Sequence, residues 1–156
     1  DRWRRAAAIR GTATQFLTPT TETTLTIPST AGNVITVGAY DSSTNTLAPF
    51  SGRGYTWNTG QVKPDLVAPG VDITSCAGGG GYESRSGTSM AAPFVSGSCA
   101  LLMQWGILQN NDPFLYGEKM KAYLIRGARQ LPFSVSYPNP QSGYGALCVS
   151  NSLTFV

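Results

Sequence analysis

The sequence of 156 residues contains no histidine, and only 12% of its residues are charged. A serine hydroxyl is a weak nucleophile until a base takes its proton, and histidine is that base in a Ser-His-Asp triad. The absence of histidine therefore excludes a complete triad within this chain. The 41% of hydrophobic residues indicate a globular chain rather than a disordered one, and the length suffices for one domain.

The chain is also poor in cysteine and in net charge. Its three cysteines, Cys76, Cys99 and Cys148, lack the C-x-x-C spacing of a metal site, and their odd number argues against a complete disulfide framework. The net charge of +3 is modest, and arginines near the start supply much of the basic excess. Because no nucleic-acid-binding module accompanies these arginines, we expect no nucleic-acid partner.

Long apolar runs and an initiating methionine are absent as well. No stretch approaches the roughly 18 uninterrupted apolar residues of a membrane-spanning helix, and the charged first residues do not form a signal peptide. We therefore expect no membrane span. Because the chain begins with Asp1, we also expect it to be a piece of a longer protein whose start lies upstream.

Eighteen glycines and ten prolines predict many turns, as in an α/β enzyme with long surface loops. The β-branched run Val34–Ala39 predicts a parallel strand buried on both faces, and Lys63–Val67 predicts a second strand. The segment from Thr88 to about Trp105 has no polar face and predicts a buried helix. Asp112 and Pro113 give a start signal for another helix over residues 116–126.

Residues 1–26 differ from the rest in composition. Arg10–Leu17 and Thr23–Thr26 are threonine-rich and β-prone, and turn-forming residues around Pro19 separate them. We predict two strands that complete a sheet whose other strands lie upstream.

The stretch Ser86–Pro93, which reads Ser-Gly-Thr-Ser-Met-Ala-Ala-Pro, joins a glycine-rich loop to the long apolar helix. Ser89 is predicted at the start of that helix, where free backbone N–H groups and the positive end of the helix dipole stabilise an anion. These electrostatics suit acyl transfer through a serine nucleophile. The alternative is a helix N-cap, which is the more common role of a serine before an apolar run.

Four stretches, in the same order, resemble segments of the subtilisin-like serine proteases, the subtilases. Gly87–Pro93 matches the family's nucleophile motif without a mismatch, and Lys63–Gly70 resembles the strand and turn that precede it. Ile27–Ala39 is similar to an upstream strand of the family, and Gly143–Leu147 resembles the segment that closes the fold. In addition, Phe114–Ala128 is close to subtilases of the clostridial spore-germination type.

The resemblance implies an α/β, subtilisin-like three-layer fold with a parallel sheet, of which this chain is the C-terminal portion. Residues 27–156 then form the C-terminal part of a subtilase catalytic domain. In the clostridial branch a β-sandwich is inserted ahead of the strand that begins here at Ile27. Residues 1–26 resemble the end of that inserted β-rich segment.

The resemblance also assigns roles in the nucleophile loop. Ser89 is the expected nucleophile and contributes its backbone N–H to the oxyanion hole, Gly87 and Thr88 shape the loop, and Ser86 is a candidate substrate-binding residue. The family's aspartate, histidine and oxyanion-hole asparagine precede the serine, so we expect them upstream of this chain. No lysine stands in a Ser-x-x-Lys arrangement with Ser89 to replace them.

Three residues outside the motif have expected roles. Asp65 lies where the family has a structural turn, so we expect it to make structural hydrogen bonds rather than to act as a catalytic acid. The glycines Gly78–Gly81 lack the ending of a phosphate-binding loop and predict a mobile hairpin or loop. Glu83 or Arg85, which follow this run, are hypothesised to touch the leaving-group side of a substrate.

No cofactor is predicted. Calcium is common in the family, and Asp41 and Asp72 are candidate ligands, although no oxygen-rich series of residues surrounds them. No other metal site is expected.

These features predict a serine endopeptidase acting on a protein or peptide substrate, with this chain inactive by itself. A pseudoprotease with a binding or regulatory role is the alternative, and a purely structural α/β domain is a third interpretation. Without the upstream half of the catalytic domain, sheet edges and core surface are exposed, so we expect pairing with that half or with a second copy. The resemblance implies a secreted or spore-associated protein.

Overall fold

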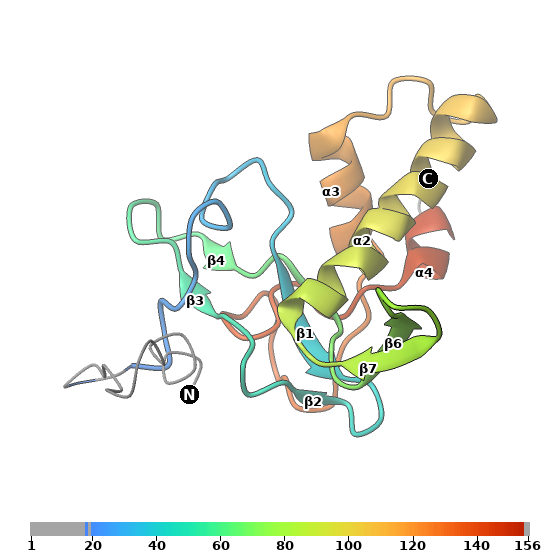
Figure 1. Ribbon diagram of the computed structural model, residues 1–156. Coiled ribbons are helices and arrows are strands. Elements are labelled where there is room, and N and C mark those ends of the chain that lie inside the picture. The colour runs from blue at the N-terminus through green and yellow to red at the C-terminus, as the bar shows by residue number, and fades with distance from the viewer. Residues whose placement is uncertain (1–17, 19, 155–156) are drawn as a thin grey trace.

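The computed structural model of the chain describes residue 18 and residues 20–154. Three small sheets and a group of helices make up this part of the chain (Figure 1). The elements are β1 (Val37–Asp41), β2 (Thr46–Leu47), β3 (Gly54–Tyr55), β4 (Val62–Lys63), β5 (Leu66–Pro69), β6 (Ile73–Cys76), β7 (Tyr82–Arg85), α2 (Thr88–Met103), the π-helical turn η1 (Gln104–Leu108), α3 (Gly117–Arg126) and α4 (Val149–Thr154).

The main sheet has the strand order β2-β1-β5. β1 and β5 run parallel, with Gly38 opposite Val67, and β2 is antiparallel to β1. A short stretch continues the sheet beyond β5, because the Val67 N–H donates to the Gly145 carbonyl at 3.0 Å and the Val67 carbonyl accepts from the Leu147 N–H at 2.9 Å. The predicted parallel strand is confirmed, although it begins at Val37, later than expected.

Each face of this sheet buries a different part of the chain, because side chains alternate across a strand. Ala39 and Ala68 face the helices and belong to one core cluster with residues of α2 and α3. Val67 faces the other way and packs with the irregular segment that precedes α4. In Figure 1, α2 crosses in front of β1. The sheet therefore has α2 on one face and the C-terminal segment on the other.

Both predicted helices are present as α2 and α3, and α3 begins within one residue of its predicted start, but the predicted N-cap at Asp112 is wrong. Tyr116, rather than Asp112, precedes the first residue of α3. The Asp112 carboxylate instead accepts hydrogen bonds from Lys119 at 2.6 Å and from the Tyr123 hydroxyl at 2.9 Å. The hydrogen bond from Lys119 holds the pKa of the Asp112 carboxyl below its usual value. Asp112 thus ties the preceding loop to the side of α3.

Of the two strands predicted before Ile27, residues 10–17 lie outside the described residues, and the strand at 23–26 is wrong. The Thr24 N–H donates to the Arg53 carbonyl, and the Arg53 N–H donates to the Thr24 hydroxyl, each at 3.0 Å. The segment therefore lies beside β3 without forming a ladder. Thr23 has a φ of +59°, which breaks the extended conformation that a ladder requires.

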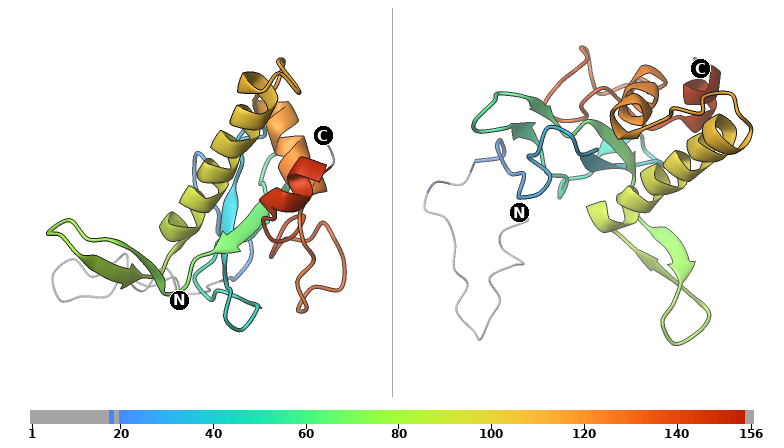
Figure 2. Two further views of the ribbon diagram at one scale, coloured as in Figure 1. Left: turned by 90° about the vertical axis from the view of Figure 1, so that its right-hand side faces the viewer. Right: turned by 90° about the horizontal axis from the view of Figure 1, so that it is seen from above.

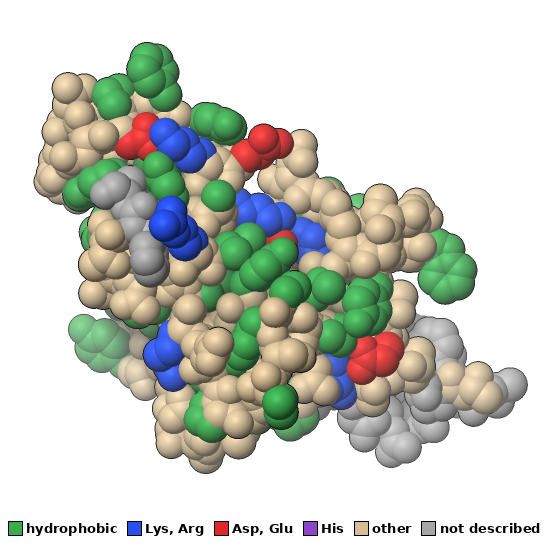
Figure 3. All heavy atoms as spheres, turned by 180° about the vertical axis from the view of Figure 1, so that it is seen from behind, with side chains coloured by type: hydrophobic (Ala, Val, Ile, Leu, Met, Phe, Trp, Pro, Cys, Tyr) green, Lys and Arg blue, Asp and Glu red, His purple; other side chains and the backbone are tan. Residues whose placement is uncertain are grey.

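The helix α2 is buried on one side only, whereas its sequence predicted burial all round. Phe94 and Leu101, seven residues apart, lie on a second face and are 42% and 50% exposed, and Met103 on another side of the helix is 46% exposed. The described residues cover these side chains only in part. Exposed hydrophobic side chains also form several groups on the far side of the molecule (Figure 3). The buried residues of α2 are Ala91, Val95, Ser98 and Leu102.

Together α2 and η1 form a helical stretch of 21 residues, Thr88–Leu108, within which an 18-residue window has a mean hydropathy of 1.4. By length and composition alone this stretch is able to cross a membrane, contrary to what its interrupted apolar run suggested. The buried side of α2 packs against β1 and β5, which gives the apolar sequence a role in the core. The expected absence of a membrane span stays a prediction.

A buried ion cluster joins the sheet to α3. The Asp65 carboxylate pairs with Lys63 through one oxygen and with Lys121 of α3 through the other, each at 2.8 Å. The Thr36 N–H donates to the same carboxylate at 2.7 Å, and both ammonium groups also donate to the Val34 carbonyl. Lys63 and Asp65 are 1% and 4% exposed, so Asp65 has the structural role that the sequence predicted.

Asp65→Asn should destabilise the fold, because it leaves two ammonium groups close together with no carboxylate between them. Burial already lowers the pKa of the Lys63 ammonium, and the hydrogen bond with Asp65 opposes that shift. We expect a loss of about 3 kcal/mol in urea unfolding, the lower end of the range for breaking a buried pair, because Lys121 is partly exposed.

The matched control is Asp41→Asn, since the Asp41 carboxylate bonds to Ser43 and Thr44, which directly follow it in the chain, and forms no ion pair among the described residues. Its effect should stay within about 0.5 kcal/mol. Equal unfolding midpoints for the two variants would contradict a stabilising role for the cluster.

Candidate active site

Ser89 is the second residue of α2 and is exposed. Within the described part of the chain its hydroxyl has no hydrogen-bond partner. The residue that precedes the helix is Gly87, and α2 has no side-chain cap. The N-cap alternative for Ser89 is therefore wrong, and its hydroxyl is available to react.

Free backbone donors lie beside this hydroxyl. The N–H groups of Met90 and Ala91 both donate to the Gly87 carbonyl, at 3.0 and 3.3 Å. Those of Thr88 and Ser89 have no acceptor among the residues that the structure describes. Because they lie at the positive end of a 16-residue helix, they favour a negative charge at this place.

The nucleophile loop, Ser86–Ser89, is held against the end of β5. The Gly87 N–H donates to the Gly70 carbonyl at 2.8 Å. A Cβ on Gly70 would lie 2.6 Å from the Ala39 Cβ and 2.9 Å from the Gly87 carbonyl oxygen. Only a residue without a side chain allows β1, the end of β5 and the loop to approach so closely.

The Ser86 hydroxyl bonds to Asp72, in the turn between β5 and β6. It accepts from the Asp72 N–H at 2.8 Å and donates to Asp72 Oδ1 at 3.2 Å. Asp72 has a φ of +52°, in the left-handed region that aspartate tolerates better than most residues. The role of Ser86 in substrate binding stays a prediction, and its hydroxyl is already engaged by Asp72.

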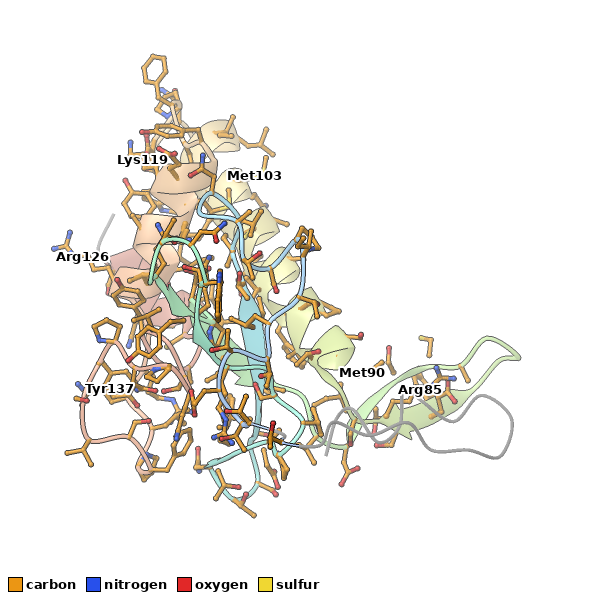
Figure 4. All side chains as sticks on the ribbon, turned by 90° about the vertical axis from the view of Figure 1, so that its left-hand side faces the viewer. Arg85, Met90, Met103, Lys119, Arg126 and Tyr137 are labelled. Atoms are coloured by element: carbon orange, nitrogen blue, oxygen red, sulfur yellow. The ribbon has the colours of Figure 1, made fainter. Side chains whose placement is uncertain are left out.

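β6 and β7 form an antiparallel hairpin that projects from the body of the molecule beside the start of α2 (Figure 2). Gly78–Gly81 lie at its tip with open space around them, and the glycine run thus forms the predicted hairpin. On β7, Arg85 Nη2 lies 2.6 Å from Glu83 Oε1. Figure 4 shows Arg85 on the hairpin and Met90 at the adjoining end of α2.

The candidate calcium ligands lie apart in the fold, Asp41 as the last residue of β1 and Asp72 in the turn after β5. Hydrogen bonds from the hydroxyl and the N–H of Ser43 hold the pKa of the Asp41 carboxyl below its usual value. The described residues include no group of three or more Asp, Glu, Cys or His side chains able to hold a metal ion. Calcium binding stays a prediction.

The sequence profile of the Subtilase family matches residues 13–146, which include the main sheet, the nucleophile loop and both long helices. The chain belongs to the subtilase family. Curated relatives agree with this assignment. The chain is 35% identical over 150 residues to serine protease AprX of Bacillus subtilis, and this match covers 83% of the chain. The chain is 39% identical over 113 residues to subtilisin-like protease SBT6.1 of Arabidopsis thaliana, and this match covers 69% of the chain.

Solved structures confirm the subtilisin-like α/β fold. The CspB protease of Clostridium perfringens superposes on 92% of this subtilase chain, with 52% identity and a TM-score of 0.86. The self-cleaved protease domain of PatA superposes on 83%, with 32% identity and a TM-score of 0.65. The clostridial source of the first structure agrees with the branch that the sequence resembles. The inserted β-sandwich stays a prediction.

The subtilase chain spans only part of these proteins. It covers 32% of the length of AprX, 11% of SBT6.1 and 31% of the CspB chain.

The sequence identified Ser89 and its loop but missed the residues that hold the loop in place. Gly70 was noted only as the end of a family-like stretch, and Asp72 only as a candidate calcium ligand. The available signal was the Lys63–Gly70 stretch itself, which resembles the strand and turn that precede the nucleophile loop in the family. No local pattern indicates that Asp72 contacts Ser86 across the hairpin.

Gly70→Ala should disturb the site, because the added methyl group meets both Ala39 and the loop carbonyl. We expect overpacking to lower the free energy of unfolding by about 1–3 kcal/mol and to speed hydrogen exchange at the Gly87 N–H. Thermal unfolding and exchange mass spectrometry measure the two effects. Gly78→Ala is the control, since a methyl group there meets open space. Unchanged stability and exchange in Gly70→Ala would contradict the close approach.

Proposed function

We propose that this subtilase chain carries the nucleophile of a serine endopeptidase, with Ser89 forming the acyl-enzyme. The observation that carries the proposal is the exposed Ser89 hydroxyl, which has no partner among the described residues and lies beside two free N–H groups. Family membership supports the same role.

In the proposed reaction the Ser89 oxygen attacks the carbonyl carbon of a peptide bond, and the serine proton passes to a base. The C–N bond then breaks, the amine leaves with a proton from that base, and water hydrolyses the acyl-enzyme. The Ser89 N–H and the start of α2 stabilise the negative charge on the carbonyl oxygen. Gly87 and Thr88 set the shape of the loop around it.

The base, its orienting acid and the side-chain donor of the oxyanion hole are proposed to come from the upstream half of the catalytic domain. The absence of histidine from this chain supports that proposal. By itself the chain is therefore inactive, because a hydroxyl without a base is a weak nucleophile at neutral pH.

The exposed face of α2 supports contact with that upstream half. Gly97 lies on this face, between Phe94 and Leu101 in helical spacing, and a Cβ there would meet nothing within 4 Å. A glycine in a helix interior destabilises by about 1 kcal/mol relative to alanine, so it is expected where another segment packs closely. A second copy of the chain is the alternative occupant of this face.

The proposed substrate is a protein or peptide. The position of β7 directly before the nucleophile loop supports contacts of Glu83 or Arg85 with the leaving-group side of the substrate, and it supports substrate binding at Ser86. The relatives include the minor extracellular protease Vpr of Bacillus subtilis, which supports a secreted protein. Association with spores rests only on the clostridial resemblance.

A fluorophosphonate probe tests the nucleophile directly. We expect the complete protein to be labelled on Ser89, because an activated serine attacks the phosphorus of the probe, and Ser89→Ala should abolish labelling. Mass spectrometry of the labelled peptide identifies the residue. Ser96→Ala, a change on an exposed serine later in α2, is the control and should leave labelling intact.

Absence of labelling in a folded, complete protein would contradict the endopeptidase. The pseudoprotease with a binding or regulatory role would then be the remaining function for this fold.

Gly97→Ala tests the packing on α2. In the complete protein we expect this change to lower the free energy of unfolding by about 1–3 kcal/mol, because a methyl group would overpack a filled interface. Gly117→Ala on α3, where a Cβ also meets open space, should not be destabilising. Stabilisation by Gly97→Ala, as at a solvent-exposed helix glycine, would contradict coverage of this face.

A further inference from the structure

We propose that Asp72 is a positioning residue for the nucleophile loop, acting through the hydroxyl of Ser86. An effect of Asp72 on the reactivity of Ser89 rests on the proposed function. The anchoring of the loop rests only on the contacts of Asp72 with Ser86 and of Gly70 with Gly87.

Asp72 and Ser86 make a reciprocal pair of hydrogen bonds. The single hydroxyl of Ser86 accepts from the Asp72 N–H and donates to the Asp72 carboxylate, so both its position and its rotation are fixed. The next residue, Gly87, donates its N–H to Gly70 on the same turn. Two successive loop residues are therefore anchored to the turn after β5.

These anchors act on the start of α2. The Gly87 carbonyl accepts the N–H groups of Met90 and Ala91, so a shift of Gly87 moves the first turn of the helix. Ser89 lies within that turn, and its hydroxyl has no bond of its own among the described residues. Its position therefore depends on the backbone around it. The anchors at Ser86 and Gly87 set that backbone.

The hairpin explains why the loop requires such an anchor. The β6–β7 hairpin begins with Ile73 opposite Arg85, directly beside the Asp72–Ser86 pair. Most of its residues are exposed, and a two-stranded hairpin is at best marginally stable in water. Without the Asp72–Ser86 hydrogen bonds at its base, motion of the projecting hairpin would displace Ser86 and the nucleophile loop that follows it (Figure 2).

The backbone of Asp72 allows a clean test. Its φ of +52° suits glycine without strain, so Asp72→Gly removes the carboxylate while the backbone N–H still reaches Ser86. Asp72→Asn keeps an acceptor oxygen in the same place and tolerates the same backbone conformation. Ser86→Ala removes both hydrogen bonds at once.

The experiment measures labelling of the complete protein by a fluorophosphonate probe at increasing concentration, which separates kinact from KI. We expect Asp72→Gly to lower kinact about two- to tenfold with KI unchanged, since an exposed hydrogen bond of ordinary strength is lost. Asp72→Asn should restore kinact to within about twofold of the wild type. Asp72→Gly added to Ser86→Ala should have almost no further effect, because the two residues act through one contact.

A matched control separates positioning from general stability. Asp41 makes a similar pair of bonds with Ser43 in the turn after β1, away from the loop. Ser43→Ala, which removes the hydroxyl of that pair, should leave kinact unchanged. Hydrogen exchange at the Gly87 N–H should become faster in Asp72→Gly and remain at the wild-type rate in Ser43→Ala.

If the wild type is labelled and Asp72→Gly reacts at the same kinact, positioning by Asp72 is refuted while the nucleophile assignment survives. If the wild type is not labelled, the proposed endopeptidase fails, and hydrogen exchange decides alone. Faster exchange at Gly87 in Asp72→Gly then supports the anchor, and unchanged exchange overturns it.

Discussion

The arrangement of this subtilase chain depends on one close backbone approach, between Gly70 and Gly87. Their hydrogen bond of 2.8 Å joins the end of β5 to the nucleophile loop, and a Cβ on Gly70 would be only 2.6 Å from the Ala39 Cβ on β1. The parallel strands β1 and β5 thus fix the position of the loop, and the loop fixes the start of α2. The position of Ser89 depends on these backbone contacts, since its own hydroxyl bonds to no described residue.

The same helix shows what the chain does not supply. α2 buries one face against β1 and β5 and leaves large apolar side chains of the other face about half exposed. Burial of apolar area is the main favourable term in folding, so such a face is stable only when something covers it. In a subtilase chain that spans about a third of AprX, coverage from the rest of the catalytic domain is the simplest proposal.

What the sequence predicts correctly depends on local pattern. The β-branched run before Tyr40 and the spacing in α3 specify a buried strand and an amphipathic helix without reference to distant residues. Asp112 was misread, because its partners Lys119 and Tyr123 act in tertiary contact and override its tendency to cap a helix. The one-sided burial of α2 was missed for another reason: apolar composition indicates that a face suits burial but not what covers it.

The contacts of the loop divide the chemistry of the site into two parts. Position and electrostatics come from this chain, through the turn at Gly70, the Asp72–Ser86 pair and the free N–H groups at the start of α2. Activation of the hydroxyl requires a base that a chain without histidine does not contain. A serine that is positioned but not activated has little reactivity with peptides. The separation explains how an intact nucleophile motif is compatible with the proposed inactivity of the chain by itself.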